Sequence, residues 1–203
     1  MGLNILIILG HPDRFSFNHA LARAVCAVLV ENRHQVVFHD LYAEGFDPFL
    51  APEEIPLDGR VPAPIRQHCD QLQSADGIVI VHPNWWGQPP AILKGWIDRV
   101  VRPGVAYRFE EGDCGEGVPV GLLKARTALV LNTSNTPERR EFTEFGDPLE
   151  TIWKRCIFGL CGVPHVRRRM FNVICTSSLE QRQEWLAEAR KLAAELFPAQ
   201  IQA

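Results

Sequence analysis

The chain has 203 residues, is 46% hydrophobic and 22% charged, and carries a formal net charge of −3. This balance is typical of a folded globular protein and gives no electrostatic case for binding nucleic acid or an anionic membrane. No apolar run approaches the roughly 20 residues of a membrane-spanning helix, and no basic leader precedes the first apolar run. We therefore expect a soluble, cytoplasmic protein that folds as a single domain over residues 1–203.

Short runs of Val, Ile and Leu alternate with amphipathic helical patterns along the chain. Such continuous apolar runs are typical of parallel strands that are buried on both faces of a sheet. We expect strands at 5–9, 36–39, 77–81, 127–131 and 170–175. We expect helices at 18–30, 64–72, 90–100, 148–160 and 179–196.

This alternation predicts an α/β fold in which one parallel sheet lies between two helical layers. Right-handed crossovers leave few topologies, and five strands favour a flavodoxin-like three-layer sandwich with strand order 2-1-3-4-5. In such sheets the ligand crevice lies beyond the carboxyl ends of strands 1 and 3. The segments 41–62 and 102–123 are too long for simple connectors, which is typical of functional loops.

Some polar and aromatic residues carry little functional signal. The six cysteines form no C-x-x-C pair and no histidine spacing is typical of zinc, so we predict no metal site. The basic run at 167–169 is expected to be a solvated patch near a strand edge, with a phosphate contact as the alternative. Trp96 and Trp153 lie on apolar helix faces and are expected in the core, unless one of them reaches an interface.

The first predicted strand runs directly into a polar loop before a helix. The loop and the helix start contain His11, Ser16, Phe17 and Asn18. A helix start offers free backbone N–H groups at the positive end of a dipole, which suits a phosphate. The alternative is an ordinary turn in which Ser16 or Asn18 caps the helix.

Two further loops follow the third and fourth predicted strands. Pro83, Asn84, Trp85 and Trp86 follow the third strand, and the paired tryptophans indicate a flat aromatic ligand. The fourth strand ends in polar residues that can bond to the edge of a heteroaromatic ring, although a simple polar turn explains them equally well. These residues are Asn132, Thr133, Ser134 and Asn135.

With these motifs the chain resembles the flavodoxin-like NAD(P)H:quinone oxidoreductase family. That family includes modulators of drug activity and ancillary reductases of potassium-efflux systems. The resemblance is carried by 10–12, 16–18 and above all by the long block at 83–100. It implies an enzyme that binds FMN or FAD and passes electrons from NAD(P)H, as co-substrate, to quinones. It also implies a homodimer.

By this resemblance, His11, Ser16, Phe17 and Asn18 would hold the flavin phosphate and ribityl chain. The 83–86 loop would wrap the isoalloxazine, and the 132–135 loop would contact its pyrimidine edge. Tyr107 and Phe109 would border the substrate pocket, by way of the partner subunit in many members; plain packing is the alternative. Chain length and Arg182, a candidate for a pyrophosphate contact, favour FAD slightly over FMN.

One departure from the family pattern concerns proton relay. Mammalian-type members place a Tyr and a His in the loop after strand four, and the segment 137–147 here contains neither. Arg139 or Arg140 would instead stabilise negative charge on reduced flavin, or else is a solvated loop residue. The catalytic residues therefore stay unassigned. The competing function is a flavin-binding regulatory subunit of a membrane transport system.

Overall fold

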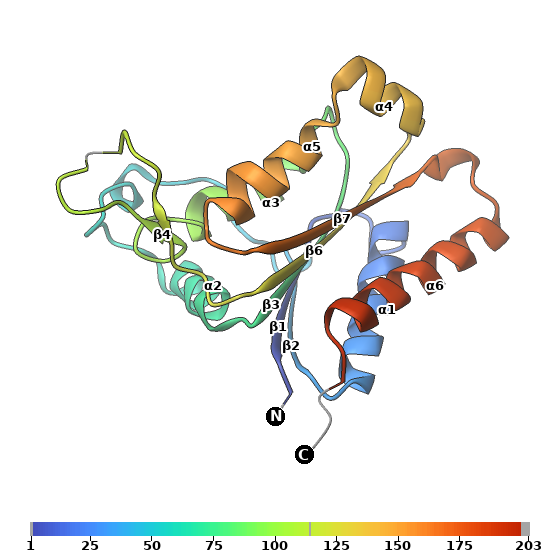
Figure 1. Ribbon diagram of the computed structural model, residues 1–203, viewed down its shortest axis with the longest axis horizontal. Coiled ribbons are helices and arrows are strands. Elements are labelled where there is room, and N and C mark those ends of the chain that lie inside the picture. Colours follow the sequence, from blue (N-terminus) through green and yellow to red (C-terminus); the bar gives the residue numbers. More distant parts are fainter. Residues whose placement is uncertain (1, 114, 200–203) are drawn as a thin grey trace.

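The computed structural model describes residues 2–113 and 115–199. Its centre is a five-stranded parallel sheet in the order β2-β1-β3-β6-β7, which confirms the predicted flavodoxin-like topology (Figure 1). The strands are β1 (Asn4–Leu9), β2 (Gln35–Asp40), β3 (Gly77–Pro83), β6 (Thr127–Ser134) and β7 (His165–Asn172).

Burial explains why the three central strands are nearly pure runs of apolar residues. All seven residues of β3 are buried, and β1 and β6 are exposed only at their first residue. Helices lie on both faces of the sheet, so neither face of these strands reaches water. The edge strands β2 and β7 are more polar and less buried.

The helices form two layers, each with its own apolar cluster against the sheet (Figure 1). One layer contains α1 (Phe17–Glu31) and α6 (Leu179–Leu196). The other contains α2 (Ala63–Ser74), α3 (Ala91–Val100) and α5 (Pro148–Thr151), which continues as the π-helical segment η2 (Ile152–Gly159). Trp96 and Trp153 are buried in this second layer, as expected for core residues.

The fifth strand is the main error of the sequence-based assignment. It spans His165–Asn172, whereas we predicted 170–175 from the apolar residues there. Its middle carries the three consecutive arginines that we expected to be solvated. That expectation is wrong for Arg168, whose side chain is only 4% exposed and ion-paired to Asp147 and Glu150. A strand that buries a paired charge gives no apolar run, so hydropathy alone misses it.

The long segments contain small elements of their own. The 102–123 segment forms a hairpin of β4 (Tyr107–Arg108) and β5 (Val120–Gly121), and the 41–62 segment contains a 3₁₀ turn, η1 (Pro52–Glu54). A 3₁₀ turn, η3 (Ile174–Thr176), follows β7. The stretch after β6, treated above as a loop, forms helix α4 (Glu138–Phe145). In Figure 1, α4 lies above the upper ends of the strands.

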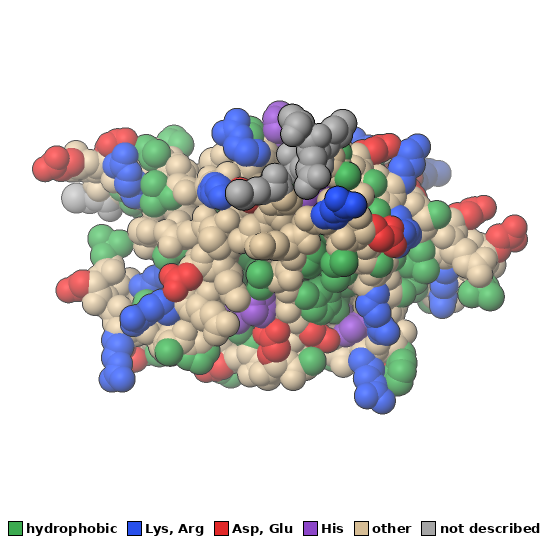
Figure 2. Space-filling view, turned by 90° about the horizontal axis from the view of Figure 1, so that it is seen from below, with side chains coloured by type: hydrophobic (Ala, Val, Ile, Leu, Met, Phe, Trp, Pro, Cys, Tyr) green, Lys and Arg blue, Asp and Glu red, His purple; other side chains and the backbone are tan. Residues whose placement is uncertain are grey.

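The surface agrees with the small net charge. Figure 2 shows the face that carries the chain ends, where acidic and basic side chains are intermingled. Within the described ranges, none of the helices is both long and apolar enough to cross a membrane.

Candidate functional site

The loop between β1 and α1 presents the start of a helix to the carboxyl edge of the sheet. Ser16 is the N-cap of α1, because its hydroxyl accepts from the backbone N–H of His19. His19 in turn lies 3.0 Å from the Ser16 Oγ and 2.9 Å from Asp40 at the end of β2. Among the described residues, the backbone N–H groups of Phe17 and Asn18 have no acceptor. This pair of free donors at a helix start is suited to an anion.

Asn18 joins this first loop to the end of β6. Its Nδ2 donates to the Thr133 hydroxyl at 2.9 Å, and the Thr133 carbonyl accepts from the backbone N–H of Asn84 at 2.6 Å. The Oδ1 of Asn18 is buried and has no hydrogen-bond partner among the described residues. A buried, unpaired amide oxygen costs free energy unless a ligand supplies a donor. The three predicted loops therefore meet at this amide, and the junction has an open acceptor.

The loop after β3 holds the two tryptophans in a tight turn. Trp85 and Gln88 exchange two backbone hydrogen bonds of 3.0 Å, and the two residues between them, Trp86 and Gly87, have φ of 57° and 72°. Positive φ at both central positions defines a type I′ turn, which normally disfavours a bulky residue. Gly87 is required here, because a Cβ would lie 2.8 Å from Pro148. The turn holds the Trp86 indole fully exposed to solvent.

His11 connects the first loop to the tryptophan turn. Its ring centroid lies 6.2 Å from that of Trp85, and its Nδ1 lies 3.0 Å from the backbone nitrogen and 3.2 Å from the carbonyl oxygen of Asp13. Burial lowers the pKa of His11, although bonding to the Asp13 backbone opposes this shift. The partly buried His11 imidazole therefore lies between the first loop and the tryptophan turn.

A cavity of about 490 Å³ lies between the tryptophan turn and α4. Its volume is in the range of small-molecule sites. Its lining includes Trp86, Thr136, Arg140 and Glu141. Glu141 is 1% exposed and accepts from the Nδ2 of Asn84 at 3.0 Å, so it fixes the turn from the α4 side.

A buried ion network lies behind Asn132, at the opposite side of β6. Arg168 donates to the Asn132 Oδ1 at 2.7 Å and to Glu150 at 2.9 Å, and it is paired with Asp147. Burial raises the pKa of Asp147, against the lowering effect of the Arg168 charge. The Nδ2 of Asn132 is buried and has no partner among the residues described. Arg168 thus holds the amide in one orientation and leaves its N–H₂ group free.

His82 supports the end of β3 from within the core. Its Nε2 accepts from the indole N–H of Trp153 at 3.0 Å, and its Nδ1 lies 2.8 Å from the Pro83 carbonyl and donates to it. Burial lowers the pKa of His82 to about 4. A neutral imidazole with both nitrogens satisfied fixes the backbone at which the tryptophan loop begins.

Comparison with known proteins agrees with the fold. A protein-family model described as a flavodoxin-like fold matches residues 3–196. The chain belongs to this flavodoxin-like family. Its five-stranded sheet has the order expected of that fold.

Oxidoreductases of other organisms are similar to this flavodoxin-like chain over most of its length. It is 37% identical to an uncharacterized NAD(P)H oxidoreductase of Haemophilus influenzae, with 85% of each chain covered. It is 30% identical to an FMN-dependent NADH:quinone oxidoreductase of Sinorhizobium fredii, covering 95% of this chain and 96% of the relative. The solved NAD(P)H:quinone oxidoreductase of Methanothermobacter marburgensis is 25% identical, with a TM-score of 0.80 and coverage of 97% and 98%.

Not every predicted site residue of this family member lies at the junction of the three loops. The Phe17 ring is turned into the core, with centroids 6.3 Å from Phe171 and 5.9 Å from Trp185. Ser134 accepts from the backbone N–H of Thr136 at 3.0 Å, and Asn135 accepts from that of Cys175 at 3.0 Å. These three side chains are therefore engaged within the chain, where they shape the loops.

Tyr107 and Phe109 lie in a different cavity of the same chain. Their rings form an edge-to-face pair, with centroids 5.9 Å apart, and line a cavity of about 380 Å³ together with Ile97 and Leu160. Neither residue lines the cavity at Trp86. Within one chain, the structure therefore does not bring them to the strand-end junction.

Three arginines named from the sequence differ in their surroundings. Arg182 donates to the Ser177 hydroxyl at 2.8 Å and to the Ile174 carbonyl at 3.0 Å, so its guanidinium holds the start of α6. Arg139 is exposed on α4. Arg140 is also exposed, and it lines the cavity beside Trp86.

Sequence reasoning missed three residues whose side chains hold the strand-end loops in place, namely His19, Glu141 and Arg168. Pro137 before α4 and Gly146 after it are helix boundary signals that would have placed Glu141 on a helix. No comparable signal marks Arg168, because its partners are distant in sequence.

Proposed function

We propose that this protein is a flavin-dependent NAD(P)H:quinone oxidoreductase that uses FMN. The observation that carries the proposal is the junction at Asn18, where three strand-end loops meet around a buried amide oxygen without a donor. The backbone N–H groups at the start of α1 are free beside this amide. The exposed indole of Trp86 lies on the loop that follows β3. An anion, a polyhydroxyl chain and a flat ring are the parts of a flavin mononucleotide.

The residues present fit this group. The free N–H groups of Phe17 and Asn18 at the start of α1 would hold the phosphate. The Asn18 Oδ1 would accept from a ribityl hydroxyl, and the free Nδ2 of Asn132 would donate to a ring carbonyl. Trp85 and Trp86 would lie against the isoalloxazine.

A bound flavin supplies hydride acceptance from a nicotinamide and two-electron delivery to a quinone. The chain contributes position, shielding and charge. Trp86 and the lid formed by α4 would exclude water from the ring, while Arg140 places a permanent positive charge in the same cavity. Because donor and acceptor would use one cavity, we expect ping-pong kinetics.

FMN rather than FAD follows from two points. The guanidinium of Arg182, our candidate for a pyrophosphate contact, is already hydrogen-bonded within its own chain. The Sinorhizobium fredii relative is FMN-dependent by name. We infer FMN, and this replaces the slight preference for FAD drawn from the sequence.

We further infer a homodimer in which the partner copy completes the substrate pocket. Tyr107 and Phe109 do not line the cavity at Trp86 in their own chain, so only a second copy brings them to the pocket that the family pattern assigns to them. Light scattering tests whether the protein is a dimer. The Tyr107→Ala variant tests whether this residue, which lines the cavity next to Ile97, contributes to the partner's pocket.

The test is to denature purified protein, identify the released flavin by chromatography, and then assay quinone reduction with NADH and with NADPH. We expect FMN and turnover within the range of about 1–1000 per second typical of enzymes. Protein that binds neither FMN nor FAD would overturn the proposal. Flavin binding with turnover far below 1 per second would support the regulatory alternative instead.

Asn18→Leu provides the matched variant, because it removes the unpaired oxygen and the link to Thr133 together. We expect weaker FMN binding with a folded protein, as judged by circular dichroism. Asn32→Leu, which alters an amide at the other end of α1, is the control and is expected to keep full FMN affinity.

A further inference from the structure

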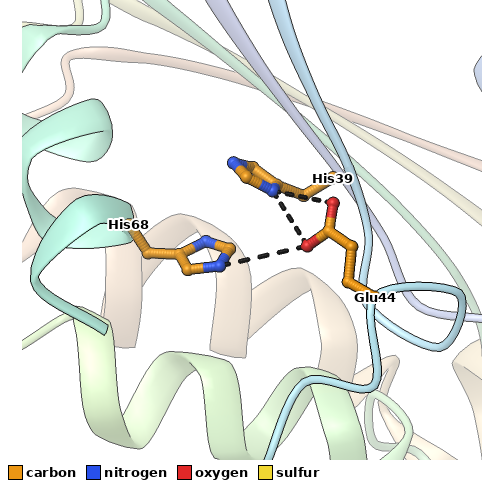
Figure 3. A group of neighbouring side chains, drawn as sticks. All are labelled: His39, Glu44 and His68. Carbon is orange, nitrogen blue, oxygen red and sulfur yellow. Dashed lines mark hydrogen bonds and ion pairs between the residues drawn. The ribbon is translucent and has the colours of Figure 1, made fainter. Parts of the chain in front are cut away.

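A second cluster of polar side chains lies on the opposite helical layer from α1, away from the strand-end junction. His39 at the end of β2, Glu44 in the following turn and His68 on α2 face one another across a short gap (Figure 3). They line a cavity of about 610 Å³. The spacing of these residues along the sequence gave no sign of the cluster, because the fold brings two of them together from a strand and a helix.

We propose that His39, Glu44 and His68 form a binding site for a divalent transition metal ion, with zinc as the best match. The His39 Nδ1 lies 2.9 and 3.0 Å from the two Glu44 oxygens, and the His68 Nε2 lies 4.0 Å from the nearer one. Zinc bonds of about 2.0–2.2 Å in tetrahedral geometry place ligand atoms roughly 3.4 Å apart. The observed distances lie on either side of that value, so small side-chain shifts complete the site.

The hydrogen bonds of His39 leave one ring nitrogen directed at Glu44. Its Nε2 lies 2.8 Å from the Gln71 Oε1, an acceptor, so Nε2 carries a proton. The Nδ1 of His39 faces the Glu44 carboxylate and is the ring nitrogen left for a metal ion. An outer-shell amide that receives the second ring N–H is the usual arrangement for a metal-binding histidine.

His68 distinguishes a metal from a simple proton. It is 8% exposed, and its Nε2 has no hydrogen bond to any described residue although it faces the cavity. The imidazole lines the cavity beside His39, with ring centroids 4.1 Å apart, so its Nε2 is placed for coordination. A proton between His39 and Glu44 leaves this nitrogen unused, whereas a zinc ion uses all three groups.

Two neighbours set the strength of the site. The Trp96 indole donates to the His68 Nδ1 at 3.3 Å, and this weak bond must break when zinc takes Nε2, because the proton then moves to Nδ1. Arg99 also lines the cavity, but its guanidinium is paired with Glu54 at 2.7 Å. The same guanidinium also pairs with Asp47 at 3.5 Å, so Glu44 is the carboxylate of this cavity that has no arginine partner among the described residues. The cavity leaves room for a water molecule as fourth ligand.

The bound ion would connect the first turn of the 41–62 segment to α2. Glu44 belongs to that segment, and the Phe46 ring lies edge-on against His68 with centroids 5.3 Å apart. The site is independent of the flavin proposal, because none of its residues belongs to the three strand-end loops.

The test is equilibrium dialysis of tag-free, flavin-loaded protein against zinc, with bound metal counted by atomic absorption. We expect one zinc ion per chain, and a loss of at least tenfold in affinity for Glu44→Gln and for His68→Gln. Glu53→Gln and His165→Gln change exposed residues outside the cluster and are expected to bind zinc like the unaltered protein. Zinc binding that survives Glu44→Gln, as it would at the exposed thiols of Cys156 and Cys175, overturns the proposal.

Two further variants separate coordination from a packing role. Gln71→Leu removes the acceptor that orients His39 and is expected to weaken zinc binding about tenfold. Trp96→Phe removes the donor that competes for His68 and is expected to strengthen binding. Weaker or unchanged binding in Trp96→Phe would contradict the role of His68 as a ligand.

Discussion

Two regions of the molecule each contain a buried histidine that accepts a hydrogen bond from a buried tryptophan. The two histidines differ in what their second ring nitrogen contacts. Behind the strand-end junction, His82 accepts from the indole of Trp153, and its second nitrogen donates to a carbonyl. In the α2 layer, His68 accepts from the indole of Trp96, but its second nitrogen has no hydrogen bond among the described residues. His82 has both nitrogens paired and fixes the backbone, whereas the Nε2 of His68 faces a cavity and is available to the metal ion proposed above.

The two regions also each bury an arginine. Arg99 holds the 41–62 segment through Glu54. Arg168 is paired with Asp147 and Glu150, and it alone also reaches a residue of the strand-end loops, Asn132. Both arginines are buried, but only the loss of Arg168 is therefore expected to affect the strand-end loops.

The largest effect is expected when these arginines are replaced. Arg168→Met and Arg99→Met each leave a buried carboxylate unpaired, so each is expected to lower the free energy of unfolding by about 3–5 kcal/mol. Only Arg168→Met is expected to weaken flavin binding as well, because Asn132 loses its orientation. Urea denaturation and flavin titration measure the two quantities. Equal loss of flavin affinity in both variants would remove the distinction between the regions.

The next effect is a loss of stability in acid. Burial lowers the pKa of His82 to about 4. The unfolded chain takes up a proton on this residue near its ordinary pKa of about 6.5, while the folded chain does not until about pH 4. Stability contributed by the neutral form is complete above that higher value and is lost as the pH falls toward the lower one, by about 3 kcal/mol.

Unfolding measured between pH 7 and pH 4 checks this prediction. His82→Gln keeps an acceptor for Trp153 and is expected to flatten the pH dependence. An unchanged slope in that variant would mean that other groups dominate.

A smaller effect is expected at Asn18. Asn18→Ala removes the hydrogen bond to Thr133 and the unpaired Oδ1, so the free energy of FMN binding is expected to weaken by about 1–3 kcal/mol. Fluorescence titration with FMN measures this. Thr133→Val removes the same hydrogen bond but keeps the Oδ1, so it is expected to lose less affinity than Asn18→Ala.

The smallest effect on stability is expected at Trp86. Its side chain is fully exposed and its backbone is left-handed, so Trp86→Gly relieves strain and is expected to stabilise the fold by up to about 1 kcal/mol. The same change is expected to weaken FMN binding, because a stacking surface is lost. Trp86→Phe is the control that keeps an aromatic ring. A Trp86→Gly variant with full FMN affinity would exclude the indole from the site.

The fold was predictable because its central strands are apolar by necessity. Residues of β1, β3 and β6 face helices on both sides, which leaves a direct trace in the sequence. The edge strand β7 was misplaced because Arg168 is buried by pairing rather than by apolar character. Helix α4 was missed because its apolar residues, Phe142 and Phe145, are exposed and few.

The sequence predicted which loops form the candidate site, but not which residues hold those loops in place. Strand ends and turn residues identify Asn18, Trp86 and Thr133, but not the groups that hold them. Glu141 contacts Asn84 across 57 positions of sequence, and such a pairing leaves no local pattern. The cluster at His39 is similar, since its members lie on separate elements.

The hydrogen bond between Asn18 and Thr133 joins residues 115 positions apart. A chain still being synthesised cannot assemble the binding site until β6 has left the ribosome and docked beside β3. Under the function proposed above, yellow colour would appear only in molecules that have completed most of their sheet. Pigment retention would then serve as a simple optical readout of correctly folded material during expression and storage.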